Sequence, residues 1–204
     1  KHVLDHNHRH RQAPHGRQAG FAHDKQRCTV CHRHRSIIVP IHAVALDREL
    51  GSLAAALNVL ASSPALRSGD LEGFHRQAAE VRDRTGYWVV LSDRATNRQL
   101  VNTRVPWGTP LPTSAIPAPS EAALGSGRRA IVSNLFVGAV AKAPLFAVQI
   151  PIERNGQIAY LLSVSVPIEA MRDVLVSEEP PDGWIASVVD RDGVILARNE
   201  RHAE

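Results

Sequence analysis

The residues best suited to metal or cofactor chemistry lie near the N-terminus, in Cys28-Thr-Val-Cys31-His32. This sequence matches C-x-x-C-H, in which two thiols attach a c-type haem and the imidazole ligates its iron. Together with His34, the same side chains could equally bind Zn²⁺. Either site needs a surrounding fold, and the flanking residues are polar and show no helical or strand period. We therefore expect no cofactor and no metal, and keep a c-type haem or metal-binding redox protein as an alternative.

Signatures of catalysis are missing from the sequence. It contains no G-x-S-x-G, H-E-x-x-H, Walker or G-x-G-x-x-G motif, and no nucleotide-binding boxes of a kinase. Asp190 and Asp192 are the carboxylates that most resemble metal ligands, but the rest of a calcium-binding loop is absent. We expect them to be structural residues of a turn, and we expect no catalytic residues and no enzymatic activity in this chain.

The net charge of +4 arises from the N-terminal segment alone. Residues 1–35 hold eight Lys or Arg against two Asp or Glu, a net charge of +6, which leaves −2 for residues 36–204. The segment also holds eight of the 11 histidines and few large apolar residues. Burial cannot offset the entropy of ordering such a segment, so residues 1–35 are predicted to be a disordered, basic, His-rich leader. With the basicity confined there, we expect no nucleic-acid partner.

Two amphipathic helices are predicted next. The first begins near Val44 and ends near Ser62-Ser63-Pro64, because leucines recur at helical spacing. This stripe would pack in the core or form a dimer seam, and it consists of Leu46, Leu50, Leu53, Leu57 and Leu60. The second helix, Leu71–Arg84, has Asp70 as its N-cap and ends at Gly86. His75 lies beside its apolar stripe and is expected to be a surface or capping residue.

Five strands follow, separated by turn-forming residues. Their predicted ranges are Tyr87–Leu91, Gln99–Val105, Ala130–Val137, Leu145–Glu153 and Gln157–Ile168. Asn155-Gly156 is a strong hairpin turn between the last two. A long connection rich in proline precedes Ala130, with a short helix at Ser120–Leu124. The pattern predicts an α+β fold, in which the helices cover one face of a five-stranded antiparallel sheet.

The C-terminal residues predict the beginning of a second module. A connecting helix at Ile168–Glu178 leads to a hairpin whose strands are Trp184–Val189 and Val194–Arg198. This hairpin resembles the one at 87–105 and cannot bury its apolar face alone. We predict a complete domain at 44–168, and at 169–204 the connecting helix and the start of an incomplete second domain. The hairpin should leave an unpaired edge.

A ligand site is predicted between the long connection and the sheet face beneath it. Small-molecule sites combine apolar walls with a few polar groups. Arg104 could bind a carboxylate and Trp107 could wall the site. Ser133, Asn134 and Gln149 could provide hydrogen bonds. Equally, Arg104 could be solvated and Trp107 could close the edge of the core.

Three segments resemble the double-Cache sensor region of bacterial membrane histidine kinases, an extracytoplasmic PAS-like region. They are 46–53, Asn102-Thr-Arg-Val-Pro-Trp-Gly-Thr-Pro-Leu-Pro112 and the closing stretch 183–198, so that the resemblance covers about residues 44–204. The resemblance implies a long stalk helix, a membrane-distal PAS-like domain that binds a small ligand and a smaller membrane-proximal domain. Membrane helices and a kinase core are missing from this sequence.

The function that the resemblance implies is small-molecule sensing outside the cytoplasm, at the cell membrane of a bacterium. The parent receptor would most often be a histidine kinase of a two-component system, although a chemoreceptor or a cyclic-dinucleotide enzyme would use the same sensor. The N-terminal helix would support a homodimer. The alternative from another class is a structural dimerisation stalk without a ligand.

Overall fold

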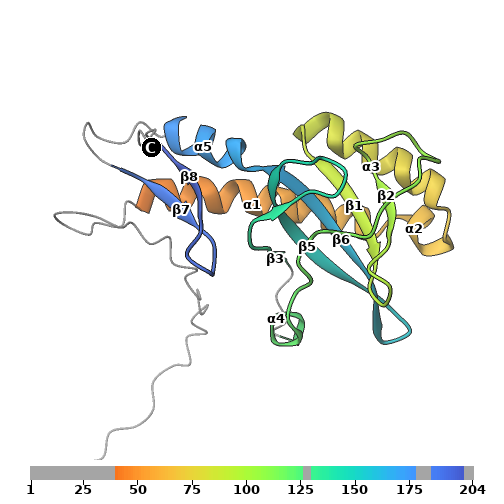
Figure 1. Cartoon of the computed structure of the whole chain (residues 1–204). Coiled ribbons are helices and arrows are strands. Elements are labelled where there is room, and N and C mark those ends of the chain that lie inside the picture. The colour runs from red at the N-terminus through yellow and green to blue at the C-terminus, as the bar shows by residue number, and fades with distance from the viewer. Residues whose placement is uncertain (1–39, 126–129, 178–184, 200–204) are drawn as a thin grey trace, which may run out of the picture.

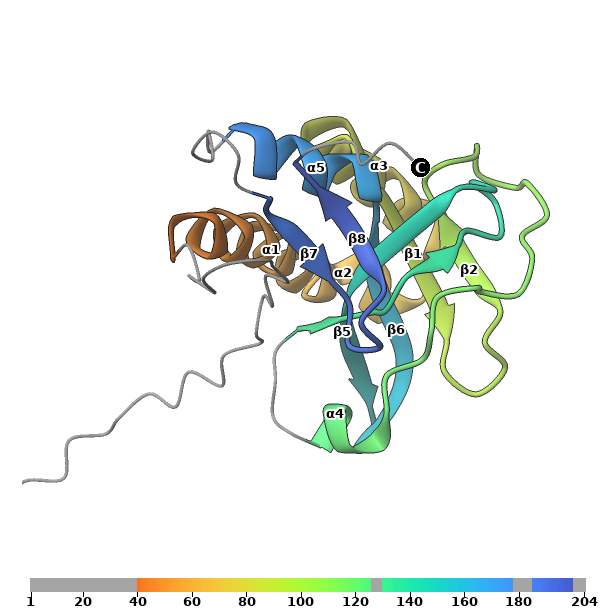
Figure 2. The same ribbon diagram turned by 60° about the vertical axis from the view of Figure 1, so that its left-hand side comes forward.

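The computed structural model describes residues 40–125, 130–177 and 185–199. The leader at 1–35 and the Cys28-Cys31-His32 motif lie outside these ranges, so the expectations about them stay predictions. Within the described ranges, a sheet carries helices on one face, and a smaller hairpin lies beside helix α5 (Figures 1 and 2). Of the helices described, none is long and apolar enough to cross a membrane.

Three helices begin the described chain, and capping residues bound the second and the third. Helix α1, Pro40–Ala61, buries Leu46, Leu53, Leu57 and Leu60, so that the leucine stripe packs into the core of this chain. Helix α2, Pro64–Ser68, was not predicted; Pro64 occupies its first turn, where proline is favoured, and Ser63 caps it. Helix α3, Leu71–Thr85, begins and ends as predicted. The Gly73 N–H donates to Asp70 Oδ1 (2.8 Å), and Gly86 is left-handed with φ 77°.

The sheet is antiparallel with strand order β2-β1-β6-β5-β3, and β4 also pairs with β5. Its strands are β1 Trp88–Asp93, β2 Gln99–Asn102, β3 Ile131–Val132, β4 Phe136–Val137, β5 Pro144–Arg154 and β6 Gln157–Pro167. The predicted strand at 130–137 is wrong as one element, because Ser133 to Leu135 leave the ladder between β3 and β4. The Asn155-Gly156 turn is confirmed, with φ 52° and 75°.

The two faces of the sheet differ in chemistry. Alternate residues of the long strands, such as Phe146 and Val148 in β5 and Leu162 and Val164 in β6, form the core beneath α1 and α3. The other face is covered by the long connection, which includes helix α4, Glu121–Gly125. There Val90, Ala147 and Ile116 form a smaller apolar cluster with Phe136. The chain has the α+β architecture of the PAS/Cache-like sensor fold that the sequence predicted.

The C-terminal part contains helix α5, Ile168–Ser177, and a separate two-stranded sheet of β7, Ser187–Val189, and β8, Ile195–Arg198. Strand β8 packs against α5. Among the described residues β7 and β8 pair only with each other, in keeping with the predicted unpaired edge. That this hairpin begins a second domain stays a prediction, and Trp184 lies outside the described residues.

Candidate ligand-binding site

The sheet face turned away from α1 and α3 carries a group of buried polar side chains. Each is at most 8% exposed, and the group comprises Ser92, Gln99, Asn102, Gln149, Ser163 and Ser165. The strand register places them together, because Val90 lies opposite both Asn102 and Ser163, while Gln149 also lies opposite Ser163. Burying polar groups is costly unless they find partners. Such a polar floor is therefore typical of a surface that binds something.

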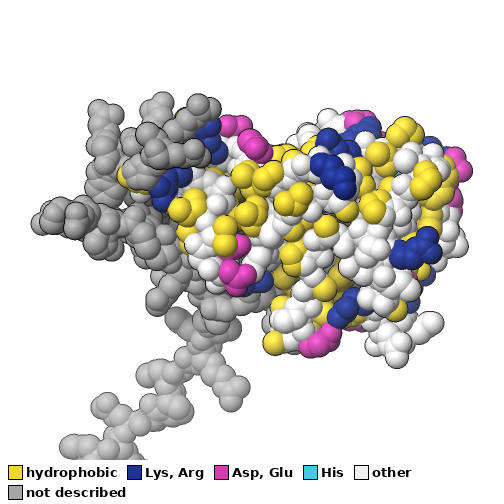
Figure 3. Space-filling model, viewed as in Figure 1, with side chains coloured by type: hydrophobic (Ala, Val, Ile, Leu, Met, Phe, Trp, Pro, Cys, Tyr) yellow, Lys and Arg dark blue, Asp and Glu magenta, His cyan; other side chains and the backbone are white. Residues whose placement is uncertain are grey.

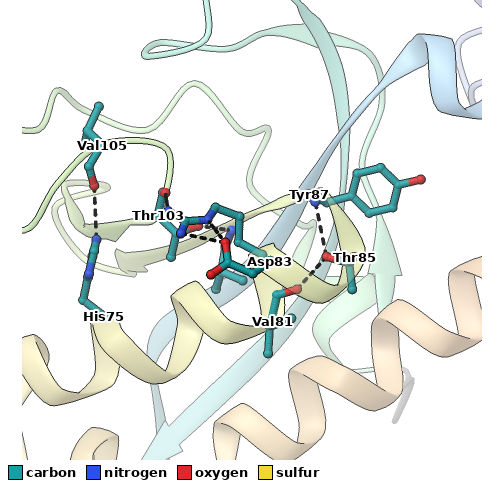
Figure 4. A network of polar contacts seen from close by, with 9 residues as sticks. His75, Val81, Asp83, Thr85, Tyr87, Thr103 and Val105 are labelled. Carbon is teal, nitrogen blue, oxygen red and sulfur yellow. Dashed lines mark hydrogen bonds and ion pairs between the residues drawn. The ribbon is translucent and has the colours of Figure 1, made fainter.

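The segment that follows β2 is held to helix α3 by hydrogen bonds. Arg82 Nη1 donates to the Thr103 carbonyl (2.7 Å), and His75 Nε2 donates to the Val105 carbonyl (3.2 Å) (Figure 4). The Thr103 hydroxyl accepts the Val89 N–H (2.9 Å), which anchors the segment to β1. His75 is only 9% exposed, so its expected surface position is wrong: it is a buried residue that positions this segment.

Between these two anchors, Arg104 lies over the ring of Trp88. The guanidinium carbon is 4.0 Å from the ring centroid, a cation–π contact. Arg104 forms no ion pair with any residue that the structure describes. A guanidinium held on a flat ring keeps its N–H donors in a fixed plane, which suits a carboxylate. Arg104 is thus positioned by stacking and remains free to bind an anion.

Arg104 and Trp88 line a pocket on this face of the sheet, which we call the loop-face pocket. Its polar lining includes Gln99, Asn102 and Ser165. Its apolar lining includes Ile116, Phe136 and residues 138–141, and no Asp or Glu of the described residues takes part. The pocket encloses about 20 Å³, room for roughly one water molecule. A larger ligand therefore has to displace part of the roof, and Ile116, 8% exposed, is the side chain that fills it.

The five predicted ligand residues do not form one site. Arg104 lines the loop-face pocket. Trp107 lies beyond it, 43% exposed, with its ring 5.8 Å from that of His75. Gln149 is buried on the same sheet face, where its Nε2 donates to the Pro117 carbonyl (3.0 Å) and holds the roof.

The remaining two predicted residues make structural contacts. The Ser133 hydroxyl accepts the Ala147 N–H (2.9 Å) and donates to the Asn134 carbonyl (2.8 Å), which bridges the gap between β3 and β4. Asn134 Nδ2 donates to Asp192 Oδ2 (2.6 Å). The ligand roles of Ser133 and Asn134 stay predictions, and both side chains already have partners.

Sequence reasoning missed Trp88, Gln99, Asn102 and Ser165. The signal was present in β6, where Ser165 alternates with apolar residues, but not in β2. Gln99 and Asn102 are three residues apart, and an irregularity in the pairing of β1 with β2 places both on the same face. What the alternation alone could not tell is which face of the sheet the long connection covers.

The turn of the closing hairpin is fastened to the segment beside this pocket. Asp190 Oδ1 accepts the N–H groups of Asp192 and Val194 (both 2.9 Å), as expected for a turn carboxylate. Asp190 Oδ2 also accepts the Leu135 N–H (3.2 Å). Leu135 directly precedes Phe136, a lining residue of the loop-face pocket. The described part of the chain contains no cluster of three His, Cys, Asp or Glu that could hold a metal ion.

Of the comparisons with known proteins, the one with solved structures supports the fold. Neither the models of known protein families nor the curated proteins match this sequence. Among solved structures, the ligand-binding domain of the Pseudomonas fluorescens chemoreceptor CtaA, in complex with L-isoleucine, superposes with a TM-score of 0.60 at 14% identity. The match covers 79% of this chain and 66% of that one.

The ligand-binding domain of the Pseudomonas aeruginosa PAO1 amino acid chemoreceptor PctC, in complex with GABA, gives a TM-score of 0.52. Its identity is 20%, over 76% of this chain and 68% of that one. This chain therefore spans about two thirds of the length of these domains. At these identities the likeness establishes the fold, which is that of ligand-binding domains of bacterial chemoreceptors.

Proposed function

We propose that this chain is the small-molecule-sensing region of a bacterial membrane receptor and lies outside the cytoplasm. Three observations support the proposal. The fold is that of chemoreceptor ligand-binding domains, and the sheet face under the long connection carries a buried polar floor that a packed structural domain does not need. The observation that carries most weight is Arg104, stacked on Trp88 at the pocket without a carboxylate partner among the described residues.

The lining of the loop-face pocket favours a small carboxylate as ligand. Arg104 can bind a carboxylate through two N–H donors, while the amides of Gln99 and Asn102 lie in the same wall. The similar chemoreceptor domains were solved with GABA and L-isoleucine, which both carry a carboxylate. Because no Asp or Glu lines this pocket, an ammonium group would find no opposite charge there. We therefore expect organic acids to bind better than amino acids of the same size.

Signalling would follow from the small volume of the loop-face pocket, which leaves no room for a ligand until the roof moves. A ligand shifts a conformational equilibrium only by binding one conformation better than the other. Entry of a carboxylate must move Ile116 or residues 138–141, and the neighbouring Leu135 is bonded to Asp190 of the closing hairpin. Movement of the roof would then pass to the hairpin, and from there to the second domain of a double-Cache arrangement and an output such as a histidine kinase.

A thermal-shift screen tests the proposal. The purified chain is heated with a panel of mono- and dicarboxylates, amino acids and amines of two to six carbons. We expect carboxylates to raise the melting temperature and amines to leave it unchanged, since ligand binding to the folded state stabilises it by mass action. If no compound of the panel raises the melting temperature, the chain is a structural stalk instead of a sensor.

A further inference from the structure

A second hollow lies at the edge of the sheet, between helix α3, strand β2 and the loop at 105–111. We call it the edge pocket. It holds about 220 Å³, roughly ten times the volume enclosed by the loop-face pocket, and it is open to solvent. It shares Gln99 and Asn102 with that pocket, but Arg104 does not line it. The proposal made above does not use this space.

The walls of the edge pocket suit a flat, apolar group. The ring centroids of Trp107 and His75 lie 5.8 Å apart, with an angle of 54° between the rings, and Leu100, Val105 and Leu111 add apolar walls. Trp107 is 43% exposed although it is the largest side chain of this region. The hydrogen bond from His75 Nε2 to the Val105 carbonyl fixes the position of the His75 ring in the pocket wall (Figure 4). A planar ring entering the pocket would cover Trp107 by stacking.

Two donors of the edge pocket, the Gln99 amide nitrogen and the Arg98 guanidinium, have no acceptor among the described residues. Gln99 is 8% exposed, and its Oε1 accepts the Asn102 amide (2.7 Å). Its Nε2 has no hydrogen-bond partner among the described residues, which is unfavourable for a buried amide. Arg98 lies at the rim, and its guanidinium pairs with no carboxylate of the described chain. No Asp or Glu in the described part of the chain lines the pocket. Gln99 Nε2 and the Arg98 guanidinium therefore lack a hydrogen-bond acceptor, and an anionic acceptor would suit both.

We propose that the edge pocket is a second ligand site, specific for small aromatic carboxylates. The ring lies against Trp107 between the apolar walls, and the carboxylate accepts from the Arg98 guanidinium and from Gln99 Nε2. An aliphatic acid of the same charge loses the stacking, and a neutral aromatic molecule loses the ionic contact. The site therefore requires both parts of the ligand.

Calorimetric titration with benzoate tests this site. For a ligand of nine non-hydrogen atoms we expect a dissociation constant on the order of 1 mM. Cyclohexanecarboxylate should bind about fivefold more weakly because it cannot stack, and benzyl alcohol about tenfold more weakly because it lacks the charge. The variants Trp107→Leu and Arg98→Gln should each weaken benzoate binding by about five- to tenfold. Trp107→Phe, which keeps an aromatic ring, should stay close to the parent value.

The variant Arg104→Ala separates this site from the loop-face pocket. Benzoate affinity should be unchanged in Arg104→Ala and in Arg76→Gln, a matched change of an exposed arginine on α3. Loss of benzoate binding in Arg104→Ala, with retention in Trp107→Leu, would place benzoate in the loop-face pocket and overturn the proposal. Absence of binding at 10 mM benzoate, about ten times the expected dissociation constant, would also overturn it.

A measurement on the unaltered chain guards against misfolding of the variants. In two-dimensional NMR, benzoate should shift the indole N–H resonance of Trp107 and leave that of Trp88 unchanged, with Trp107→Phe serving for assignment. A shift of Trp88 without a shift of Trp107 contradicts the edge site. Neither result depends on whether the loop-face pocket binds a ligand, so the two proposals can fail separately.

Discussion

Truncation of Ile116 to alanine should destabilise the fold and tighten ligand binding at the same time. Ile116 is 8% exposed and packs on Val90, Ala147 and Phe136 in the roof of the loop-face pocket. Removing a buried isoleucine to alanine costs about 2–5 kcal/mol, least where the surroundings can collapse. The roof is a loop, in which Asn97 bonds the backbone N–H and carbonyl of Ser114 (2.8 and 3.0 Å) and the Ile116 N–H donates to Ser114 Oγ (3.2 Å). Gln149 holds it to the sheet through the Pro117 carbonyl (3.0 Å).

Because this roof can relax into the space that Ile116 leaves, we expect Ile116→Ala to lower the free energy of unfolding by about 2 kcal/mol, the lower end of the range. In a chain of this size this corresponds to a fall in melting temperature of about 4–8 °C. The affinity for the ligand, in contrast, is expected to rise. The parent chain has to move Ile116 out before a carboxylate can enter about 20 Å³ of free space. The variant avoids most of this cost, so affinity should rise about tenfold, equivalent to 1.4 kcal/mol.

The assay pairs urea unfolding with calorimetric titration of the best carboxylate from the screen. Ile131→Ala is the matched control, because Ile131 is 3% exposed in β3 but does not line the pocket. It should lose stability without gaining affinity. If Ile116→Ala binds the ligand more weakly than the parent chain, or unfolds at the same urea concentration, the role of Ile116 as the movable roof is refuted.

Three further predictions concern pH, the hairpin contact and the turns. Burial of Tyr87, together with the charges of Glu49 and Asp173, raises the pKa of its phenol, so stability should be complete below pH 10 and fall as pH rises through the raised pKa. Tyr87→Phe should remove this alkaline loss in urea unfolding curves measured between pH 9 and 12. Asp190→Ala deletes the carboxylate that accepts three backbone N–H groups. The variant should lose about 1–2 kcal/mol of unfolding free energy, and amide hydrogen exchange at Leu135 and Val194 should become faster. Unchanged exchange at these amides would rule out the contact. Gly156→Ala should destabilise by about 1 kcal/mol because φ is 75°, whereas Gly51→Ala, in open space on α1, should stabilise by a similar amount, both read from denaturation midpoints.

Features that depend on neighbouring residues could be predicted from the sequence. Asp70 and Gly86 bound α3 because a carboxylate caps its first turn and a glycine accepts a left-handed conformation at its end. Asn155-Gly156 joins β5 to β6 for a similar local reason. The leucine stripe of α1 also follows from local spacing, although only the structure decides that it packs against this chain's own sheet.

Features that depend on distant residues could not be predicted. The strand expected at 130–137 is interrupted because the Ser133 hydroxyl accepts a hydrogen bond from the N–H of Ala147, which lies 14 residues away in the sequence. Asn134 is drawn to Asp192, 58 residues away. His75 is buried by Val105 and Trp107, which follow it by some thirty residues. Of the predicted ligand residues, Arg104 lines the loop-face pocket because hydrogen bonds from α3 hold the residues on either side of it. No local sequence pattern predicts these contacts.

The most direct test of the sensor proposal is the affinity of Arg104→Ala for the best carboxylate found by the screen, measured by calorimetric titration. Loss of a charge-assisted contact in a partly open pocket should weaken binding by about tenfold or more, with the melting temperature of the free protein nearly unchanged because Arg104 is exposed. Arg172→Ala, an exposed arginine on α5, is the matched control and should bind as the parent does. Equal affinities of Arg104→Ala and Arg172→Ala would contradict a carboxylate site at the loop-face pocket.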